Sequence, residues 1–188
     1  MPVAKHPLQN NWQLWYWRNT GGSWQDNLLK VAKFKTVEDF WALFHHIEVA
    51  SNLQVGSDYN LFKDEIEPMW EDPANRKGGR WLFTLNKSTA TKAQHPKLLD
   101  DLWLEVLLCL IGEAFGEYST QVNGAVLNIR GKMDKIAVWT TDCKDMVAVK
   151  AIGRMLKERT GGNLKISYES HADTASKQSS QAKSTLVL

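Results

Sequence analysis

The sequence is poor in several features that mark common classes of protein. Its 188 residues contain only two cysteines, Cys109 in an apolar run and Cys143 in the polar segment TTDCKD. Two isolated cysteines provide neither a zinc-ligand spacing nor a disulfide framework. The low cysteine content therefore predicts a reduced cytosolic or nuclear protein.

Long apolar segments are also missing. No stretch approaches the roughly 18 consecutive apolar residues of a transmembrane helix. The first residues, MPVAKHPLQNN, lack the apolar core of a signal peptide. With 43% hydrophobic residues over 188 positions, the chain is expected to form one globular domain.

A strong charge of one sign is absent as well, since 23 basic residues face 21 acidic ones. The formal net charge of +2 does not identify a nucleic-acid-binding protein, because phosphate binding usually needs a concentrated basic face. The sequence has no glycine-rich phosphate loop and no metal-ligand spacing. We therefore expect neither an enzyme nor a bound cofactor or metal.

Tryptophan, in contrast, is abundant. The nine tryptophans are Trp12, Trp15, Trp17, Trp24, Trp41, Trp70, Trp81, Trp103 and Trp139.

Hydrophobic periodicity predicts strands and helices in alternation. Strands are expected in NWQLWYWRN, from about residue 12 to 18, and in LLKVAKFK, DYNLFK, RWLFTLN, GAVLNIR, KIAVWTT and LKISYES. Helices are expected after the N-cap Thr36, from Leu98 to Phe115, and in DMVAVKAIGRMLKER, which Gly161 and Gly162 follow. This order predicts an α+β domain, a mostly antiparallel sheet with helices on one face.

The ends of the chain differ in composition from its centre. We expect the domain to span residues 6–173, between a short N-terminal segment, 1–5, and a polar, mobile tail over residues 174–188.

The predicted helices carry more apolar residues than one buried face requires. In the first helix, Phe40, Leu43, Phe44 and Ile47 already form a stripe, which leaves Val37 and Trp41 on its flank. The second has two rows, one with Leu104, Leu108 and Ile111 and the other with Leu107, Leu110 and Ala114. The surplus indicates either packing at the edge of the core or a surface for a partner helix.

Trp24 and Trp70 lie in predicted loops among polar neighbours. A single loop tryptophan commonly anchors its loop by packing. Two indole faces can also clamp one flat, positively charged ring. Glu71, next to Trp70, could then accept the N–H donors on the edge of a guanine.

Three cations stand near strand ends, Arg80, Arg130 and Lys135. Each alone is consistent with a solvated charge on an edge strand. Together with the loop tryptophans they indicate a nucleotide and its phosphates.

Several motifs, in order from about His6 to Lys177, resemble the eukaryotic translation initiation factor 4E family. They are HPLQNNW, FKTVEDFWALFHHI, SDYNLFKDEIEPMWED, GGRW, LWLEVLLCLIGEAF, GAVLNIRGKMDKIAVWTT and SHADTASK. The resemblance implies a curved eight-stranded antiparallel sheet backed by three long helices on its convex face. It also implies a non-enzymatic factor that binds the 7-methylguanosine cap of messenger RNA on the concave face.

The resemblance assigns roles to residues of this sequence. It implies that Trp24 and Trp70 stack on the base, that Glu71 accepts from its edge and that Trp139 lies near the N7-methyl group. It implies phosphate contacts for Arg130 and Lys135, assisted by Arg80. Lys177 falls in a segment beside the phosphates and Ser180 where a regulatory phosphoserine would fall, although a plain flexible tail explains both equally well.

The resemblance also implies a second surface on the convex face. It would receive a Y-x-x-x-x-L-hydrophobic peptide from a scaffold protein of the 4G type or from inhibitory 4E-binding proteins, through His6, Pro7, Val37, Trp41, Leu104, Leu108 and Ile111. A cap-binding repressor that uses the same face for another partner is the alternative. The segment KSTATKAQHPKLLDD is longer than is usual in the family.

Overall fold

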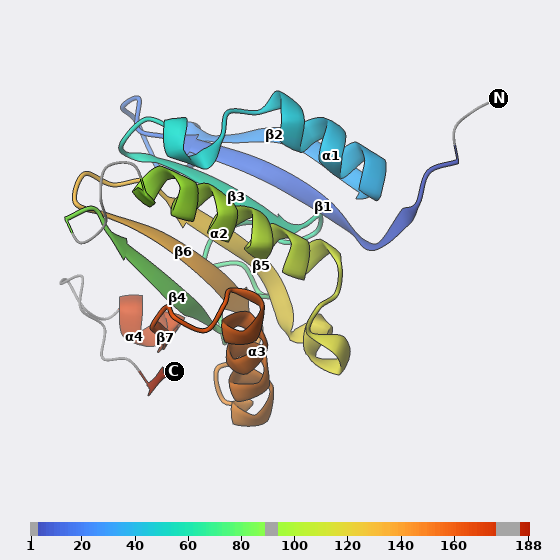
Figure 1. Cartoon of the computed structure of the whole chain (residues 1–188), viewed down its shortest axis with the longest axis vertical. Helices are drawn as coiled ribbons and strands as arrows, with labels where there is room; N and C mark the ends of the chain where they lie inside the picture. Colours follow the sequence, from blue (N-terminus) through green and yellow to red (C-terminus); the bar gives the residue numbers. More distant parts are fainter. Residues whose placement is uncertain (1–3, 89–93, 176–184) are drawn as a thin grey trace.

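A computed structural model describes residues 4–88, 94–175 and 185–188. Eight strands form one sheet in the order β2-β1-β3-β5-β6-β4-β7-β8, and every neighbouring pair is antiparallel (Figure 1). The strands are β1 (Pro7–Arg18), β2 (Leu28–Thr36), β3 (Ser57–Lys63), β4 (Gly79–Asn86), β5 (Val122–Asn128), β6 (Met133–Thr140), β7 (Ile166–Ser170) and β8 (Leu186–Val187). The predicted antiparallel sheet is confirmed.

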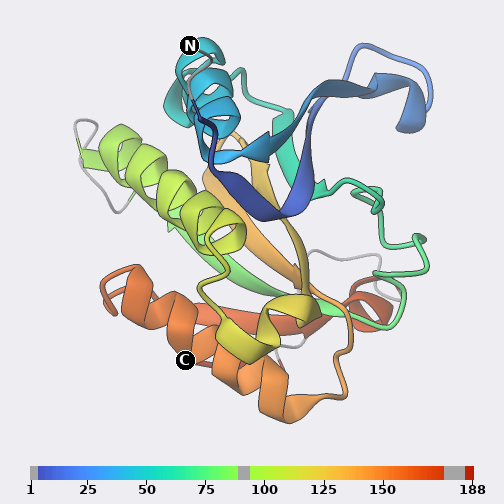
Figure 2. The same ribbon diagram turned by 90° about the vertical axis from the view of Figure 1, so that its right-hand side faces the viewer.

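Three helices, α1 (Val37–His46), α2 (Gln94–Ile111) and α3 (Met146–Arg159), lie on the convex face of the curved sheet, as Figure 2 shows. A short fourth helix, α4 (His171–Ala175), follows β7. Three 3₁₀ turns, η1 (Gln25–Asn27), η2 (Ala50–Asn52) and η3 (Gly116–Gln121), complete the regular structure of the described residues. The predicted arrangement of helices on one face is therefore confirmed.

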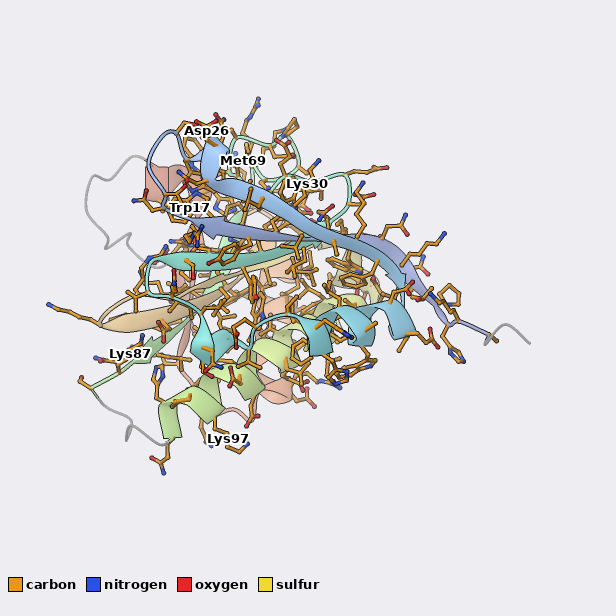
Figure 3. All side chains as sticks on the ribbon, turned by 90° about the horizontal axis from the view of Figure 1, so that it is seen from above. Trp17, Asp26, Lys30, Met69, Lys87 and Lys97 are labelled. Carbon is orange, nitrogen blue, oxygen red and sulfur yellow. The ribbon has the colours of Figure 1, made fainter. Side chains whose placement is uncertain are left out.

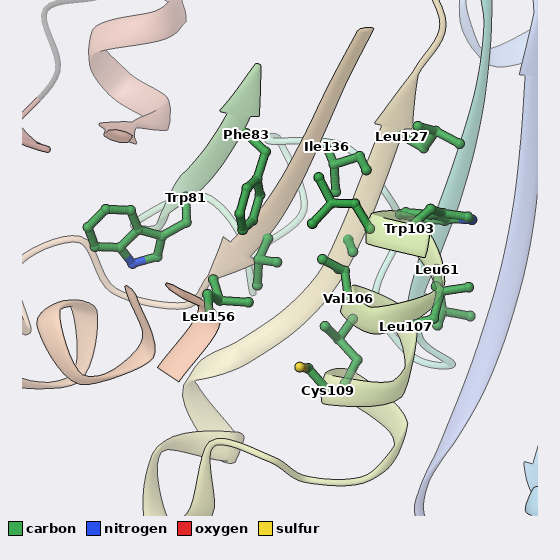
Figure 4. Close-up of a cluster of buried hydrophobic side chains, with 14 of the residues drawn as sticks. Leu61, Trp81, Phe83, Trp103, Val106, Leu107, Cys109, Leu127, Ile136 and Leu156 are labelled. Atoms are coloured by element: carbon green, nitrogen blue, oxygen red, sulfur yellow. The ribbon is translucent and has the colours of Figure 1, made fainter. Parts of the chain in front are cut away.

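The main core fills the space between the sheet and these helices. Figure 4 shows Phe83 of β4 and Ile136 of β6 on the side of the sheet that faces Trp103 and Val106 of α2, whereas Trp81 of β4 packs beside α3. All five side chains are buried. Their burial uses much of the aromatic content that the sequence carries.

Because side chains alternate between the two faces of each strand, a second set of side chains lies on the opposite, concave face of the sheet. On β6, Ile136 and Val138 belong to the main core, whereas Ala137 and Trp139 belong to a separate apolar cluster with Phe62 of β3. Successive side chains of a strand point to opposite faces, so one strand serves both surfaces. The concave face thus has its own apolar floor.

The structure corrects the predicted bounds of two elements. β1 begins at Pro7, five residues before the predicted start at Trp12. α2 begins at Gln94 and ends at Ile111, whereas the sequence predicted Leu98 to Phe115. Pro96 does not delay the helix, because residues of the first turn need no intrahelical acceptor for their N–H groups.

The predicted N-cap of α1 and the predicted end of α3 are confirmed. The Thr36 hydroxyl accepts a hydrogen bond from the Asp39 N–H at 3.2 Å, which caps α1. Gly161 and Gly162 follow α3 with φ of 85° and 75°, a conformation that glycine adopts without a Cβ clash.

The end of the chain differs from the free tail expected over residues 174–188. α4 continues through Ala175, and β8 pairs with Ser167 and Tyr168 of β7. Leu186 and Leu188 pack against the main core, which explains why this apolar end returns to the sheet. Among the described helices, none combines the length and the apolar content that crossing a membrane requires.

Candidate functional site

A cleft of about 470 Å³ opens on the concave face, between the β1–β2 loop and the β3–β4 loop. Five of the residues predicted from the sequence line it, namely Trp24, Trp70, Glu71, Arg80 and Trp139. The remaining lining residues are Gln25, Asp58, Asn60, Pro68, Met69, Val126 and Asn128. Figure 3 labels one residue of each loop, Asp26 of the β1–β2 loop and Met69 of the β3–β4 loop, and shows that both loops extend from the same side of the domain.

The loop that carries Trp24 is held by a neighbouring ring and by a buried amide. The Trp17 indole stacks on Trp24 with ring centroids 6.3 Å apart, and its Nε1 donates to the Trp24 carbonyl at 3.0 Å. The buried Asn27 amide donates to the carbonyls of Gly21 and Ser23. Trp24 is nevertheless 40% exposed, so its ring is supported and still open to a ligand.

The loop that carries Trp70 is fastened to the sheet through buried Asn75. Its amide nitrogen donates to the carbonyls of Glu67 at 3.0 Å and Met69 at 2.9 Å. The side-chain oxygen of Asn75, Oδ1, accepts a hydrogen bond from Asn123 Nδ2 of β5 at 2.9 Å. These hydrogen bonds fix the backbone of the loop, and the Trp70 ring remains 50% exposed.

Glu71 follows directly after this tryptophan and is exposed. Its backbone carbonyl accepts from Arg76 Nη2 at 3.1 Å. No hydrogen bond or ion pair to the described residues occupies its carboxylate, which remains available as an acceptor for N–H donors of a ligand.

Trp139 forms part of the floor and packs between two rings. Phe62 meets it edge-on at 5.4 Å, and His171 lies at 4.3 Å. Burial, together with the nearby Arg80 charge, lowers the pKa of His171 to about 4, so this ring is neutral at neutral pH. The floor therefore adds no positive charge from His171.

The three candidate phosphate cations are partly paired. Arg80 donates to Glu169 Oε2 from Nη2 at 3.1 Å. Arg130 donates to Asp58 Oδ1 at 2.7 Å, with its side chain still 42% exposed. Lys135 is opposite Asn128 in the β5–β6 register.

Neither Arg130 nor Lys135 lines the cleft itself. Each lies next to a residue that does, Asp58 for Arg130 and Asn128 for Lys135, so both stand at the margin of the cleft. Lys177 and Ser180 lie outside the described residues.

Sequence reasoning missed the polar part of the cleft, Asp58, Asn60 and Asn128. The available signal was the alternation on β3, where Asp58 and Asn60 occupy every second position around the buried, core-facing Tyr59. His171 was missed because only the fold brings α4 next to Trp139.

The predicted partner surface begins where the N-terminal segment meets α1. The Val37 N–H donates to the His6 carbonyl at 2.9 Å, and His6 also contacts Glu38 through Nδ1 at 2.6 Å. The hydrogen bonds from His6 lower the pKa of Glu38 to about 2. Val37 is 37% exposed, and Trp41 is half-buried, stacked on His45.

The α2 part of this surface is less exposed than the sequence analysis expected. Leu104 and Leu108 are half-buried at the edge of the core. Ile111 is only 6% exposed and belongs to the core cluster, as do Leu107 and Leu110. The last turn of α2 packs against the main core, and Ile111 is buried there.

The sequence matches the model of one protein family, Eukaryotic initiation factor 4E, over residues 7–186. The chain belongs to this family. It is 56% identical over 187 residues to Eukaryotic translation initiation factor 4E of Homo sapiens, covering 98% of this chain and 84% of the human protein. Eukaryotic translation initiation factor 4E1 of Drosophila melanogaster is 51% identical over 189 residues, 99% of this chain and 70% of that protein.

Solved structures of the eukaryotic initiation factor 4E family have the same fold. A complex of C. elegans eIF4E-3 with the 4E-binding protein Mextli aligns with a TM-score of 0.90 and 41% identity, covering 98% of this chain and 100% of that one. Ascaris suum eIF4E-3 in complex with the m7G cap aligns with a TM-score of 0.88 and 44% identity, covering 98% of each chain. The relatives are described as initiation factors, and none of these descriptions names a catalytic activity.

Proposed function

We propose that this chain binds the 7-methylguanosine cap of messenger RNA in the concave cleft and recruits the message for translation initiation through a peptide partner on the convex face. One observation carries the proposal. Two exposed loop tryptophans, a carboxylate with no partner among the described residues and a buried floor tryptophan all line one cleft. The role is one of binding, and it operates in the cytosol, with the nucleus as a second compartment.

In this proposal Trp24 and Trp70 stack on the two faces of the base. Methylation at N7 gives guanine a positive charge, and an indole face attracts such a cation by about 2 kcal/mol when water is excluded. That free energy corresponds to about thirtyfold preference over unmethylated guanosine.

Glu71 and Trp139, which also line the cleft, are proposed to contact the edge of the guanine base and its N7-methyl group. Glu71 accepts from two N–H donors on the guanine edge, a charge-assisted pairing that bases with acceptors there cannot make. Trp139, on the apolar floor, contacts the N7-methyl group. The neutral His171 behind it does not repel the cationic base.

The phosphates are proposed to extend toward the margin of the cleft, where Arg130 and Lys135 lie, with Arg80 assisting from β4. Each contact from a guanidinium or ammonium group to a phosphate is charge-assisted. Lys177 stays a proposed contact from the C-terminal segment.

On the convex face, the proposed occupant is a helical peptide with the Y-x-x-x-x-L-hydrophobic pattern. Val37, Trp41, Leu104 and Leu108 provide its apolar contacts, with His6 and Pro7 at one end. Ile111 contributes only through its small exposed edge. The partners are a scaffold protein of the 4G type and inhibitory 4E-binding proteins, which compete for one surface.

Two substitutions test these assignments together. Trp70→Ala is expected to abolish retention on immobilised 7-methylguanosine, because one stacking face is lost, and to leave partner-peptide affinity unchanged. Trp41→Ala is expected to remove partner-peptide binding and to leave retention on 7-methylguanosine unchanged. It serves as the matched control for Trp70→Ala, because each variant removes one indole ring. Retention assays and peptide titration measure both. Loss of both activities in either variant contradicts two separate surfaces.

The repressor alternative differs only in the partner. Titration of the unmodified chain with a scaffold-derived peptide separates the two roles: tight binding supports recruitment, and its absence supports repression.

A further inference from the structure

The turn between β5 and β6 carries Arg130 at its start, and Lys135 follows one residue after Asp134. Asp134 is 1% exposed, and strand alternation places it on the helix side of the sheet, whereas Lys135 is on the concave side. A buried carboxylate so close to two candidate phosphate ligands requires an explanation.

Asp134 is tied to the backbone of Arg130 and to a neighbouring lysine. Its Oδ1 accepts from the Arg130 N–H at 2.9 Å and forms an ion pair with Lys87 Nζ at 3.1 Å. Lys87 Nζ also donates to the Arg130 carbonyl at 2.7 Å. Both backbone polar groups of Arg130 are therefore held by this pair.

The second carboxylate oxygen faces α2. His95 Nε2 lies 3.5 Å from Asp134 Oδ2, close to the carboxylate but without hydrogen-bond geometry. His95 is buried in the first turn of α2. Figure 3 shows Lys87 near the start of α2, where Lys97 lies.

The Arg130 side chain is held from the other side of the sheet. Its Nη1 donates to Asp58 Oδ1 at 2.7 Å and to the Ile129 carbonyl at 2.9 Å. Asp134 thus fixes the backbone of Arg130, and Asp58 fixes its guanidinium. A cation ordered before binding loses less conformational entropy when the ligand arrives.

We propose that Asp134 is a positioning residue for phosphate binding: with Lys87 and His95 it holds the β5–β6 turn so that Arg130 meets the phosphates of the ligand. This inference rests on the proposed cap-binding function and deepens it. Asp134 touches no ligand and acts through the backbone of Arg130.

Positioning and simple electrostatics predict opposite results for Asp134→Asn. Removal of a negative charge beside a phosphate site strengthens phosphate binding if only Coulomb attraction matters. If Asp134 positions Arg130, the same change weakens it, because Lys87 loses its ion-pair partner and the turn loosens.

The experiment compares two ligands, 7-methyl-GTP and the nucleoside 7-methylguanosine, by tryptophan fluorescence titration. Asp134→Asn is expected to weaken 7-methyl-GTP binding about tenfold, the size of a lost charge-assisted contact, and to leave nucleoside binding within twofold. Asp101→Asn, an exposed carboxylate on α2, is the charge-matched control and leaves both affinities unchanged.

Unchanged or tighter 7-methyl-GTP binding by Asp134→Asn overturns the proposal, and so does an equal loss for both ligands, which indicates general damage.

If Asp134→Asn does not fold, Lys87→Gln replaces it, with Lys97→Gln as its control. Lys87→Gln is expected to show the same loss confined to 7-methyl-GTP, and equal effects of the two lysine variants overturn the proposal. Failure of the unmodified chain to bind either ligand instead refutes the proposed function.

Discussion

At the scale of single residues, tryptophans of this chain occupy contrasting environments that composition alone does not separate. Trp12, Trp81 and Trp103 are buried in the main core, where they contribute apolar area. Trp24 and Trp70 are exposed at the cleft. The difference follows the local structure, because the three core tryptophans stand on strands and a helix and the two exposed cleft tryptophans stand in loops held by buried amides.

His171 provides a prediction about pH. Its pKa in the folded chain is about 4, below the ordinary value of 6.5. Between pH 6.5 and pH 4, His171 therefore binds a proton in the unfolded chain but not in the folded chain. Stability should therefore fall as pH falls from 6.5 to 4, by up to about 3 kcal/mol. Below pH 4 this loss is complete.

Urea unfolding of the unmodified chain and of His171→Gln at pH 7, 5 and 4 measures the effect. The variant should lose part of the pH dependence between pH 7 and 4. Identical pH dependence in the two proteins shows that His171 is not responsible.

At the scale of elements, close packing of α3 on the sheet depends on Gly153. A Cβ built there lies 2.3 Å from Cζ2 of the buried Trp81 ring. The indole is held in place by its Nε1 hydrogen bond to the Val149 carbonyl at 2.9 Å. The helix approaches this closely because position 153 has no side chain.

Gly153→Ala should therefore destabilise the domain. Overpacking costs about 1–3 kcal/mol, and the better helix propensity of alanine offsets up to about 1 kcal/mol. Thermal unfolding measures the balance. Gly131→Ala, at an open position in the β5–β6 turn with nothing within 4 Å, is the control and should change stability by less than about 0.5 kcal/mol. A stabilised Gly153→Ala variant contradicts the close packing.

Local pattern predicted elements better than it predicted their ends. The pattern in DYNLFK identified β3, because Tyr59 and Leu61 occupy every second position, as in a strand with one face on a core. The short apolar run in KIAVWTT identified β6, a strand with apolar neighbours on both faces. The start of α2 was placed four residues late, because a proline reads as a break although a first turn accommodates it.

At the scale of the whole molecule, one sheet separates two candidate surfaces. The cleft lies on the concave face, and α1 and α2 carry the apolar surface on the convex face (Figure 2). No residue belongs to both the predicted cap-binding set and the predicted partner-binding set. We therefore expect a ligand on one face to leave the other face open.

Thermal unfolding with both ligands tests this separation. A ligand that binds only the folded state at 100 times its Kd stabilises it by about 2.7 kcal/mol. With 7-methyl-GTP and a Y-x-x-x-x-L-hydrophobic peptide each at that level, the stabilisations should add. A peptide that cancels the shift from 7-methyl-GTP contradicts separate sites.

The sequence by itself determined the class of fold, the cap of α1 at Thr36 and the pairing of Trp70 with Glu71, because each depends on residues that are close along the chain. Only the tertiary structure decided that Trp24 and Trp70 share a cleft with Asp58 and Trp139, that Ile111 is core and that His95 reaches Asp134. These contacts join residues distant in sequence, and strand order and helix packing, which no local periodicity encodes, determine which of them meet.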